Sequence, residues 1–265
     1  MLQVFIFLLG TAIGSFLNVL IDRLSKEQSI SGRSHCDYCK RTLAWYDLVP
    51  LISFILLRGK CRYCKKRLSW QYPIVEMVTG TLFVLMTNDK LQITNQYQIT
   101  NFQISNLYYL VAYLGIISCL IVVFFSDAKY HIIPDQVQIA LLIFSLIIIP
   151  EHGFIPQVFL QRALAAILVT LPIYFLHFIT KGKGMGFGDV KLAFIIGFMF
   201  GIKGGLLVLY FAFISGAVVG TILMLLQKRG LKSKIAFGPF LVLGTITMIF
   251  WQTQIFELIS RIYGI

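Results

Sequence analysis

Two aspartates stand at the edges of long apolar segments, where an ionised side chain is costly. Asp127 follows the run LIVVFFS, and Asp189 lies behind three glycines in GMGFGDVK. Ionisable groups inside or beside membrane segments usually serve a function. Two neighbouring carboxyls can share one proton, so that one activates a water and the other donates to a carbonyl oxygen. If these aspartates meet, the chemistry they predict is hydrolysis of a peptide bond without a covalent intermediate.

The glycines before Asp189 fit such a site. Gly184, Gly186 and Gly188 allow φ/ψ values that other residues avoid, and they would let a substrate backbone come close. We expect Gly186, Gly188 and Lys191 to support the active-site loop. The alternative role of Asp189 is that of a plain helix N-cap. A nucleotide-binding G-x-G loop is disfavoured, because no strand precedes the motif.

Two further acids lie close to predicted membrane segments. Asp135, in HIIPDQ, follows a helix-breaking proline. We expect it to cap the next helix, and we include it among the residues that support the active-site loop. Glu76, in YPIVE, lies about one turn inside a predicted span. Its interpretation stays open between a buried partner of a cation and part of a second site.

Four cysteines form two C-x2-C pairs, Cys36 with Cys39 and Cys61 with Cys64, separated by 21 residues. Each pair puts two thiolates on one tight turn, and two such turns can enclose Zn²⁺ at about 2.3 Å per bond. A redox or disulfide role and unpaired thiols are the alternatives, although a reducing cytoplasm disfavours disulfides. Four thiolates leave no open coordination position, so we expect a structural metal. The fifth cysteine, Cys119, is expected to be a core residue.

The elements that must position these residues are mostly membrane segments. Of the 265 residues, 58% are hydrophobic and 13% are charged, and the mean hydropathy is +0.82. A soluble domain has roughly 25% charged residues. One packed core of this length could not bury so much apolar surface, which excludes an ordinary soluble protein.

Apolar runs predict an all-α polytopic membrane protein with about eight transmembrane helices. The first run has no basic n-region and no A-x-A cleavage site, so we interpret it as a span rather than a signal peptide. The predicted spans cover roughly residues 2–21, 72–87, 107–126, 136–150, 157–179, 189–201, 204–226 and 236–254.

The basic residues predict the orientation of these spans. An even number of spans puts both termini on one side, and only Lys90, Arg162, Lys203 and Arg261 share that side. The other 19 of the 23 lysines and arginines lie opposite, which the positive-inside rule makes cytoplasmic. The net charge of +12 is therefore an orientation signal, with attraction to anionic lipid in addition, and gives no reason to expect nucleic acid.

Taken together, these motifs resemble a known family. The sequence is similar to the type IV prepilin leader peptidases, also called prepilin peptidase/N-methyltransferases, nearly from end to end. The resemblance rests on the cysteine loop and on GSFLNVLIDRL, FFSDAKYHIIPD, GMGFGDVKLA and AFGPFLVLG. It departs from the family in a short first segment, in the polar repeat QITNQYQITNFQISN, and in small variations of two motifs.

The resemblance implies a membrane aspartic peptidase with Asp127 and Asp189 as its catalytic pair. Such an enzyme of the bacterial inner membrane cuts the leader from prepilins or pseudopilins at the cytoplasmic face. It then methylates the new N-terminus with S-adenosylmethionine. The implied domains are a first span (1–21), a methyltransferase-associated zinc loop (22–71) and a transmembrane peptidase domain (72–265).

Two other functions stay open at this point. One is a peptidase of the preflagellin or signal-peptide type without methyl transfer. The other is a transporter with a zinc-stabilised regulatory loop. The transporter hypothesis is weakened because no inverted repeat is visible in the sequence. The sequence does not identify the processed pilin, the position of S-adenosylmethionine, or whether the chain forms a homodimer.

Overall fold

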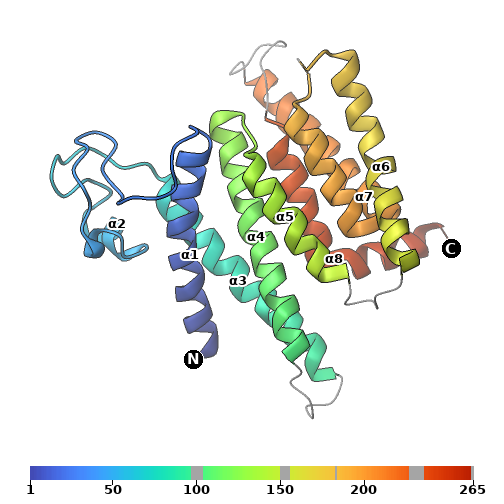
Figure 1. Ribbon diagram of the computed structural model, residues 1–265, viewed down its shortest axis with the longest axis horizontal. Helices are drawn as coiled ribbons and strands as arrows, with labels where there is room; N and C mark the ends of the chain where they lie inside the picture. Colours follow the sequence, from blue (N-terminus) through green and yellow to red (C-terminus); the bar gives the residue numbers. More distant parts are fainter. Residues whose placement is uncertain (97–103, 150–155, 183, 227–235, 264–265) are drawn as a thin grey trace. The chain divides into compact units, whose positions relative to one another are not determined.

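The computed structural model describes residues 1–96, 104–149, 156–182, 184–226 and 236–263. The described residues form helices and no strand, which confirms the all-α prediction (Figure 1). A 3₁₀ helix covers Trp45–Asp47. The α-helices are α1 (Leu2–Leu24), α2 (Ile52–Leu56), α3 (Gln71–Gln96), α4 (Ile104–Tyr130), α5 (Asp135–Ile148), α6 (Pro156–Ile179), α7 (Phe187–Leu225) and α8 (Gly238–Tyr263).

The eight predicted spans correspond to seven of these helices. Helices α1, α4, α6, α7 and α8 are long and apolar enough to cross a membrane, and α5 is a shorter apolar helix. The predicted spans 189–201 and 204–226 both lie within α7, which consists of two helices that meet at a break at Gly201 (φ 73°, ψ −173°). Arg162 donates a hydrogen bond to the Met199 carbonyl at this break. A carbonyl freed by the break is thereby satisfied, which explains a basic residue inside a span.

The chain divides into two compact units, Met1–Val122 and Val123–Ile265. In the first unit, α1 packs against α3 through small residues. A Cβ at Gly10 would lie 2.7 Å from the Gly80 Cα, and a Cβ at Gly14 would lie 2.8 Å from the Glu76 Cα. Glycine is therefore required where the two backbones approach, as is common between membrane helices.

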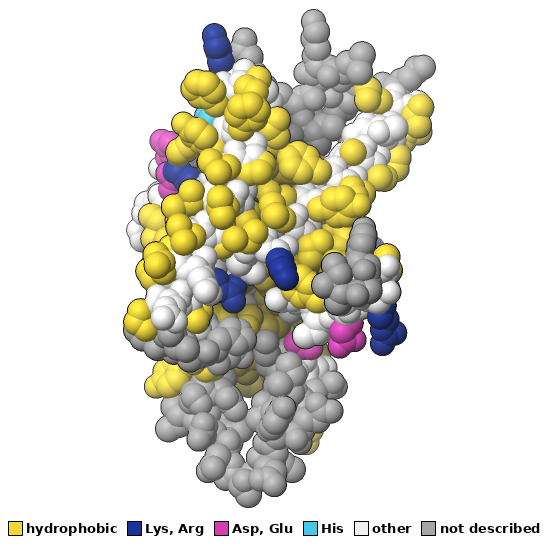
Figure 2. All heavy atoms as spheres, turned by 90° about the vertical axis from the view of Figure 1, so that its right-hand side faces the viewer, with side chains coloured by type: hydrophobic (Ala, Val, Ile, Leu, Met, Phe, Trp, Pro, Cys, Tyr) yellow, Lys and Arg dark blue, Asp and Glu magenta, His cyan; other side chains and the backbone are white. Residues whose placement is uncertain are grey.

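In the second unit, α7 is the central element and packs against α5, α6 and α8. A Cβ at Gly197 would lie 2.8 Å from the Ala166 Cα, so α6 and α7 are also in close backbone contact. The outer face of α6 exposes large apolar side chains. Figure 2 shows hydrophobic side chains over much of the side of the molecule on which α6 lies. Such a surface fits lipid rather than water, as expected for an integral membrane protein.

Candidate active site

The structure brings the two predicted aspartates together in the second unit. Asp127 lies in the last turn of α4, and Asp189 lies in the first turn of α7. Each residue is only 7% exposed, and the two carboxyls lie within electrostatic range of each other. Two buried carboxyls within electrostatic reach of each other cannot both carry a charge cheaply, and they therefore tend to hold one proton between them.

The backbone holds one oxygen of Asp189 in place. Its Oδ2 accepts a hydrogen bond from the Gly186 N–H at 3.1 Å, and Gly186 is the N-cap residue of α7. Asp189 is the third residue of α7, and a side chain at that position commonly accepts a hydrogen bond from the main-chain N–H of the N-cap residue. Its Oδ1 is buried and has no hydrogen-bond partner among the described residues, and the same holds for the Ser126 hydroxyl next to Asp127. Asp189 therefore keeps an oxygen available for a ligand.

Asp127 is held in a matching way by a residue far along the chain. Its Oδ2 accepts a hydrogen bond from the Gly238 N–H at 2.9 Å, where α8 begins. A Cβ at Gly238 would lie 2.7 Å from that oxygen, so the contact requires glycine. Sequence reasoning noted the motif AFGPFLVLG but gave Gly238 no role. The available signal was a Gly-Pro pair at the start of a predicted span.

The glycines of the motif serve close packing rather than an unusual backbone. The N-cap Gly186 has φ −71° and ψ 152°, an ordinary extended conformation. A Cβ at Gly186 would lie 3.3 Å from the Asp189 Oδ2, and a Cβ at Gly188 would lie 3.2 Å from the Ile133 Cβ. The expectation of special φ/ψ values is therefore wrong for Gly186. The structure shows close packing against the protein's own atoms, and the expected approach of a substrate backbone stays a prediction.

The prediction that Asp135 caps a helix is wrong. The N-cap of α5 is Pro134, without a side-chain cap, and Asp135 is the first helical residue. Its carboxylate instead pairs with Lys191 of α7, with an Nζ–Oδ1 distance of 2.7 Å. Both side chains are exposed, so the pair stabilises the fold by no more than about 1 kcal/mol. The structure thus joins two residues expected near the active-site loop.

Two further side chains that sequence reasoning did not identify bind the same loop. Gln138 of α5 donates a hydrogen bond from Nε2 to the Gly188 carbonyl at 2.9 Å. His177, near the end of α6, places Nδ1 2.8 Å from the Met185 carbonyl. The segment before Asp189 is therefore attached to two helices besides its own. Contacts of this kind depend on how helices pack, and neither residue stands in a motif that points to them.

The four motif cysteines of the first unit also converge. One ligand atom from each of Cys36, Cys39, Cys61 and Cys64 lies within 4.8 Å of the others, and the Sγ atoms of Cys36 and Cys64 are 3.8 Å apart. Tetrahedral zinc with bonds of about 2.3 Å requires sulfur atoms roughly 3.8 Å apart. The cluster therefore fits a metal ion.

The two cysteine pairs lie on equivalent turns. The N–H of Cys36 bonds the Arg41 carbonyl, and the N–H of Cys61 bonds the Lys66 carbonyl, five residues on in both cases. In addition, a cation from each turn lies over a tyrosine ring of the other turn. Arg41 lies 4.4 Å from the ring centroid of Tyr63, and Lys66 lies 4.8 Å from that of Tyr38. The pairs thus form a pseudo-symmetric unit in which each turn supplies a cation–π contact to the other.

The thiols of this cluster differ in acidity. Burial raises the pKa of the Cys36 thiol to about 11. A hydrogen bond from the Cys64 main chain lowers the pKa of Cys61 to about 7. N–H groups directed at sulfur stabilise the thiolate, which is the form that binds a metal.

Glu76 contacts the segment that contains the cysteines and lies in the part of α3 that faces α1. Its Oε2 accepts a hydrogen bond from the Leu51 N–H at 2.9 Å, and the side chain is buried. Leu51 has φ 59° and ψ −48°, and the Ile52 N–H bonds the Pro50 carbonyl at 2.6 Å. These values describe a γ-turn with positive φ, a strained conformation for leucine. The partner of Glu76 is thus a strained main-chain turn.

Both units match known protein families. Fold and site define an integral membrane protein with a buried pair of aspartates at the ends of two helices. Residues 8–89 match the bacterial peptidase A24 N-terminal domain, and residues 114–221 match the type IV leader peptidase family, a range that includes both aspartates. The chain belongs to the type IV leader peptidase family.

Curated relatives agree with this assignment. A Bacillus subtilis protein is 31% identical over 91% of this chain and 91% of its own length, and a Xanthomonas campestris protein is 28% identical over 97% and 94%. A Myxococcus xanthus protein is 31% identical over 85% of this chain, which spans 64% of that relative. All three are named prepilin leader peptidase/N-methyltransferase. No solved structure matches the chain.

Proposed function

We propose that the protein is a membrane aspartic endopeptidase. It cleaves the leader peptide of type IV prepilins or pseudopilins and then N-methylates the new N-terminal residue. The observation that carries the peptidase proposal is the buried pair Asp127 and Asp189, each with one oxygen bound by a main-chain N–H. The family match and the names of the relatives support the substrate class and the second activity.

The pair would hydrolyse a peptide bond by general acid–base catalysis. The ionised carboxylate takes a proton from water, and the resulting hydroxide attacks the carbonyl carbon. The protonated carboxyl donates its proton to the carbonyl oxygen, which gives a neutral tetrahedral intermediate. When the C–N bond breaks, the amine leaves with one proton and the pair again holds one. The bonds from Gly186 and Gly238 keep both carboxyls oriented throughout.

The active site would lie at the cytoplasmic face of the bacterial inner membrane. Most lysines and arginines fall in segments on the predicted cytoplasmic side, together with the ends of α4 and α7 that carry the aspartates. Both termini would then be extracytoplasmic. The domain division at residues 21 and 71 belongs to this proposal as well.

The four-cysteine cluster would hold a structural Zn²⁺. Cys36, Cys39, Cys61 and Cys64 supply all four ligands, so the ion would stabilise the loop and take no part in hydrolysis. When bound, S-adenosylmethionine would supply the methyl group that the new N-terminal amine accepts as it loses a proton. This second activity is proposed from the names of the relatives.

One experiment tests both activities. Purified protein in detergent is incubated with a prepilin, with and without S-adenosylmethionine, and the products are weighed by mass spectrometry. We expect a shortened pilin that gains the mass of one methyl group only when the donor is present. Asp127→Asn should insert normally and leave the prepilin intact. Near-normal cleavage by this variant would refute the dyad, and cleavage without methylation would favour the peptidase-only alternative.

A further inference from the structure

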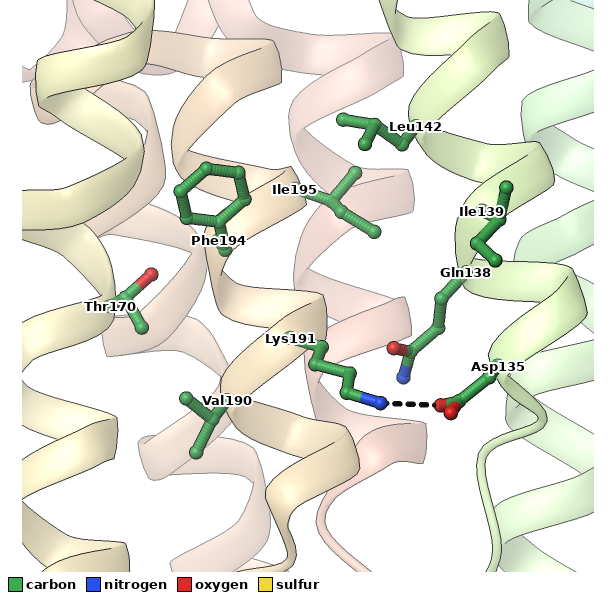
Figure 3. A pocket seen from close by; sticks show the side chains of 9 residues that line it. All are labelled: Asp135, Gln138, Ile139, Leu142, Thr170, Val190, Lys191, Phe194 and Ile195. Atoms are coloured by element: carbon green, nitrogen blue, oxygen red, sulfur yellow. Dashed lines mark hydrogen bonds and ion pairs between the residues drawn. The ribbon is translucent and has the colours of Figure 1, made fainter.

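A cavity of about 430 Å³ lies in the second unit between α5, α6 and α7 (Figure 3). Its walls are mainly apolar and include Leu142, Val190, Phe194 and Ile195. The exposed ion pair of Asp135 and Lys191 lies at one end of it. The cavity is therefore an apolar space that adjoins the residues directly following Asp189.

One polar group in this cavity has an unused hydrogen-bonding atom. Gln138 is only 3% exposed, and its side chain extends from α5 toward α7 (Figure 3). Its Nε2 is committed to the Gly188 carbonyl, which also fixes the orientation of the amide, because an oxygen there would face another oxygen. Its Oε1 is buried and has no hydrogen-bond partner among the residues that the structure describes.

A buried acceptor of this kind calls for a donor. Leaving a carbonyl-type oxygen buried and unpaired is unfavourable, because the oxygen has lost its hydrogen bonds to water. A lipid acyl chain could fill the apolar walls but has no N–H or O–H to offer. A peptide segment satisfies both requirements, because its side chain can occupy the apolar space while its main-chain N–H bonds the oxygen. The chemistry of the cavity thus favours a peptide.

We propose that this cavity is a substrate subsite. An apolar side chain of the prepilin occupies it, and Gln138 Oε1 accepts a main-chain N–H of the same segment. The inference rests on the proposed peptidase function and deepens it. Gln138 then contacts two partners through one amide, the substrate through Oε1 and the residue before Asp189 through Nε2. Occupation of the subsite therefore steadies the catalytic loop.

The position of the cavity predicts which part of the substrate enters it. Phe194 is five residues beyond Asp189 on α7 and so projects from roughly the opposite side of the helix, at about 100° per residue. The bound segment must pass the first turn of α7 to reach the dyad. An extended peptide advances about 3.3 Å per residue. Five helical residues rise about 7.5 Å and a helix is about 10 Å wide, so the cavity lies roughly 10 Å from the dyad and the occupying side chain is about three residues from the cleaved bond.

Kinetics of matched variants test the subsite. Thr170→Phe fills the cavity from α6, and Leu171→Phe adds a similar ring to the exposed face of the same helix. Gln138→Met removes both hydrogen bonds, and Gln136→Met makes the same change at an exposed position of α5. We expect Thr170→Phe to raise KM about tenfold and Gln138→Met to lower kcat/KM about tenfold. The two controls should stay within about twofold of wild type.

Substrate variants then identify the bound residue. Changing one apolar prepilin residue, about three residues from the cleaved bond, to Ala should lower kcat/KM about tenfold with the wild-type enzyme. The same substrate change should have no effect with the Thr170→Phe enzyme. If the losses simply multiply at every position, or if Thr170→Phe and Gln138→Met behave like their controls, the subsite is rejected.

A binding measurement keeps this inference separate from the peptidase proposal. A benzophenone amino acid replaces Ile139, an exposed residue of the cavity wall, in an Asp189→Asn background that needs no turnover. Crosslinking to the prepilin supports the subsite. Crosslinking to lipid alone overturns it. Failure of the unmodified protein to cleave prepilin would instead reject the peptidase function, whatever the crosslink shows.

Discussion

The carboxylate of Asp127 accepts a hydrogen bond from the Gly238 N–H at 2.9 Å, across 111 positions of the chain. The bond joins the end of α4 to the beginning of α8. It also fixes one oxygen of a carboxyl that must keep its orientation during proton transfer. Gly238 is therefore as much a part of the site's geometry as Gly186, which holds Asp189 in the same way.

Replacing Gly238 with alanine should impair the site specifically. The new Cβ would lie 2.7 Å from the Asp127 Oδ2, so that either the carboxyl or the start of α8 must move. We expect kcat/KM for prepilin cleavage to fall at least about tenfold, which corresponds to about 1.4 kcal/mol. The control is Gly216→Ala in α7, whose Cβ would meet the Phe240 ring at 3.4 Å, an ordinary contact. Equal activity of the two variants would contradict this account.

The two aspartates should behave as one unit. Asp127→Asn and Asp189→Asn should each lower the cleavage rate about 10³-fold or more, because one carboxyl cannot act as both acid and base. Since each single change already disables the pair, the double variant should be no slower than either one. Rates are measured with the same prepilin at equal amounts of membrane-inserted protein. Effects that multiply in the double variant would show two independent roles.

The meeting of Asp127 and Asp189 could be predicted from the sequence, because topology alone constrains it. Each lies at the predicted cytoplasmic edge of a predicted span, and residues at the same depth on the same face can come together. The cysteine cluster could be predicted for a similar reason, since C-x2-C spacing fixes each half locally. Local spacing and membrane depth are thus the two signals that a single sequence carries well.

Contacts between helices could not be predicted in this way. Gln138, His177 and Gly238 approach the site only because of how α5, α6 and α8 pack. The prediction that Asp135 caps a helix was wrong for a related reason, because its carboxylate forms an ion pair with Lys191 of another helix. A surface carboxylate has several local options of similar energy, and tertiary context decides among them.

Metal binding by the cysteine loop can be tested directly. Purified protein should contain about one zinc per chain by elemental analysis, and Cys61→Ser should lose it, because a tetrahedral site with three thiolates binds more weakly. Cys119→Ser, which changes a buried cysteine outside the cluster, should retain the metal. Chelation should make the loop sensitive to protease, since metal binding contributes folding free energy. Full metal content in Cys61→Ser would rule out the four-cysteine site.

The strained turn at Leu51 should depend on Glu76. Glu76→Ala removes the acceptor for the Leu51 N–H, so the cysteine loop should become easier to cleave with trypsin at the exposed residues Arg58 and Lys60. Leu51→Gly should make the loop more resistant to trypsin, because glycine adopts positive φ without strain. The backbone strain relieved in this way is about 1 kcal/mol. Glu76→Gln, which keeps an acceptor oxygen, is the matched control.

Combining the changes at Glu76 and Leu51 separates strain from simple loss of packing. If the carboxylate holds the turn against its strain, Leu51→Gly should restore protease resistance to Glu76→Ala, because a relaxed turn no longer needs the bond. Limited proteolysis of the single and double variants, at equal metal content, measures the effect. If the double variant is as sensitive as Glu76→Ala alone, Glu76 acts by filling space between α1 and α3 and not by holding the turn.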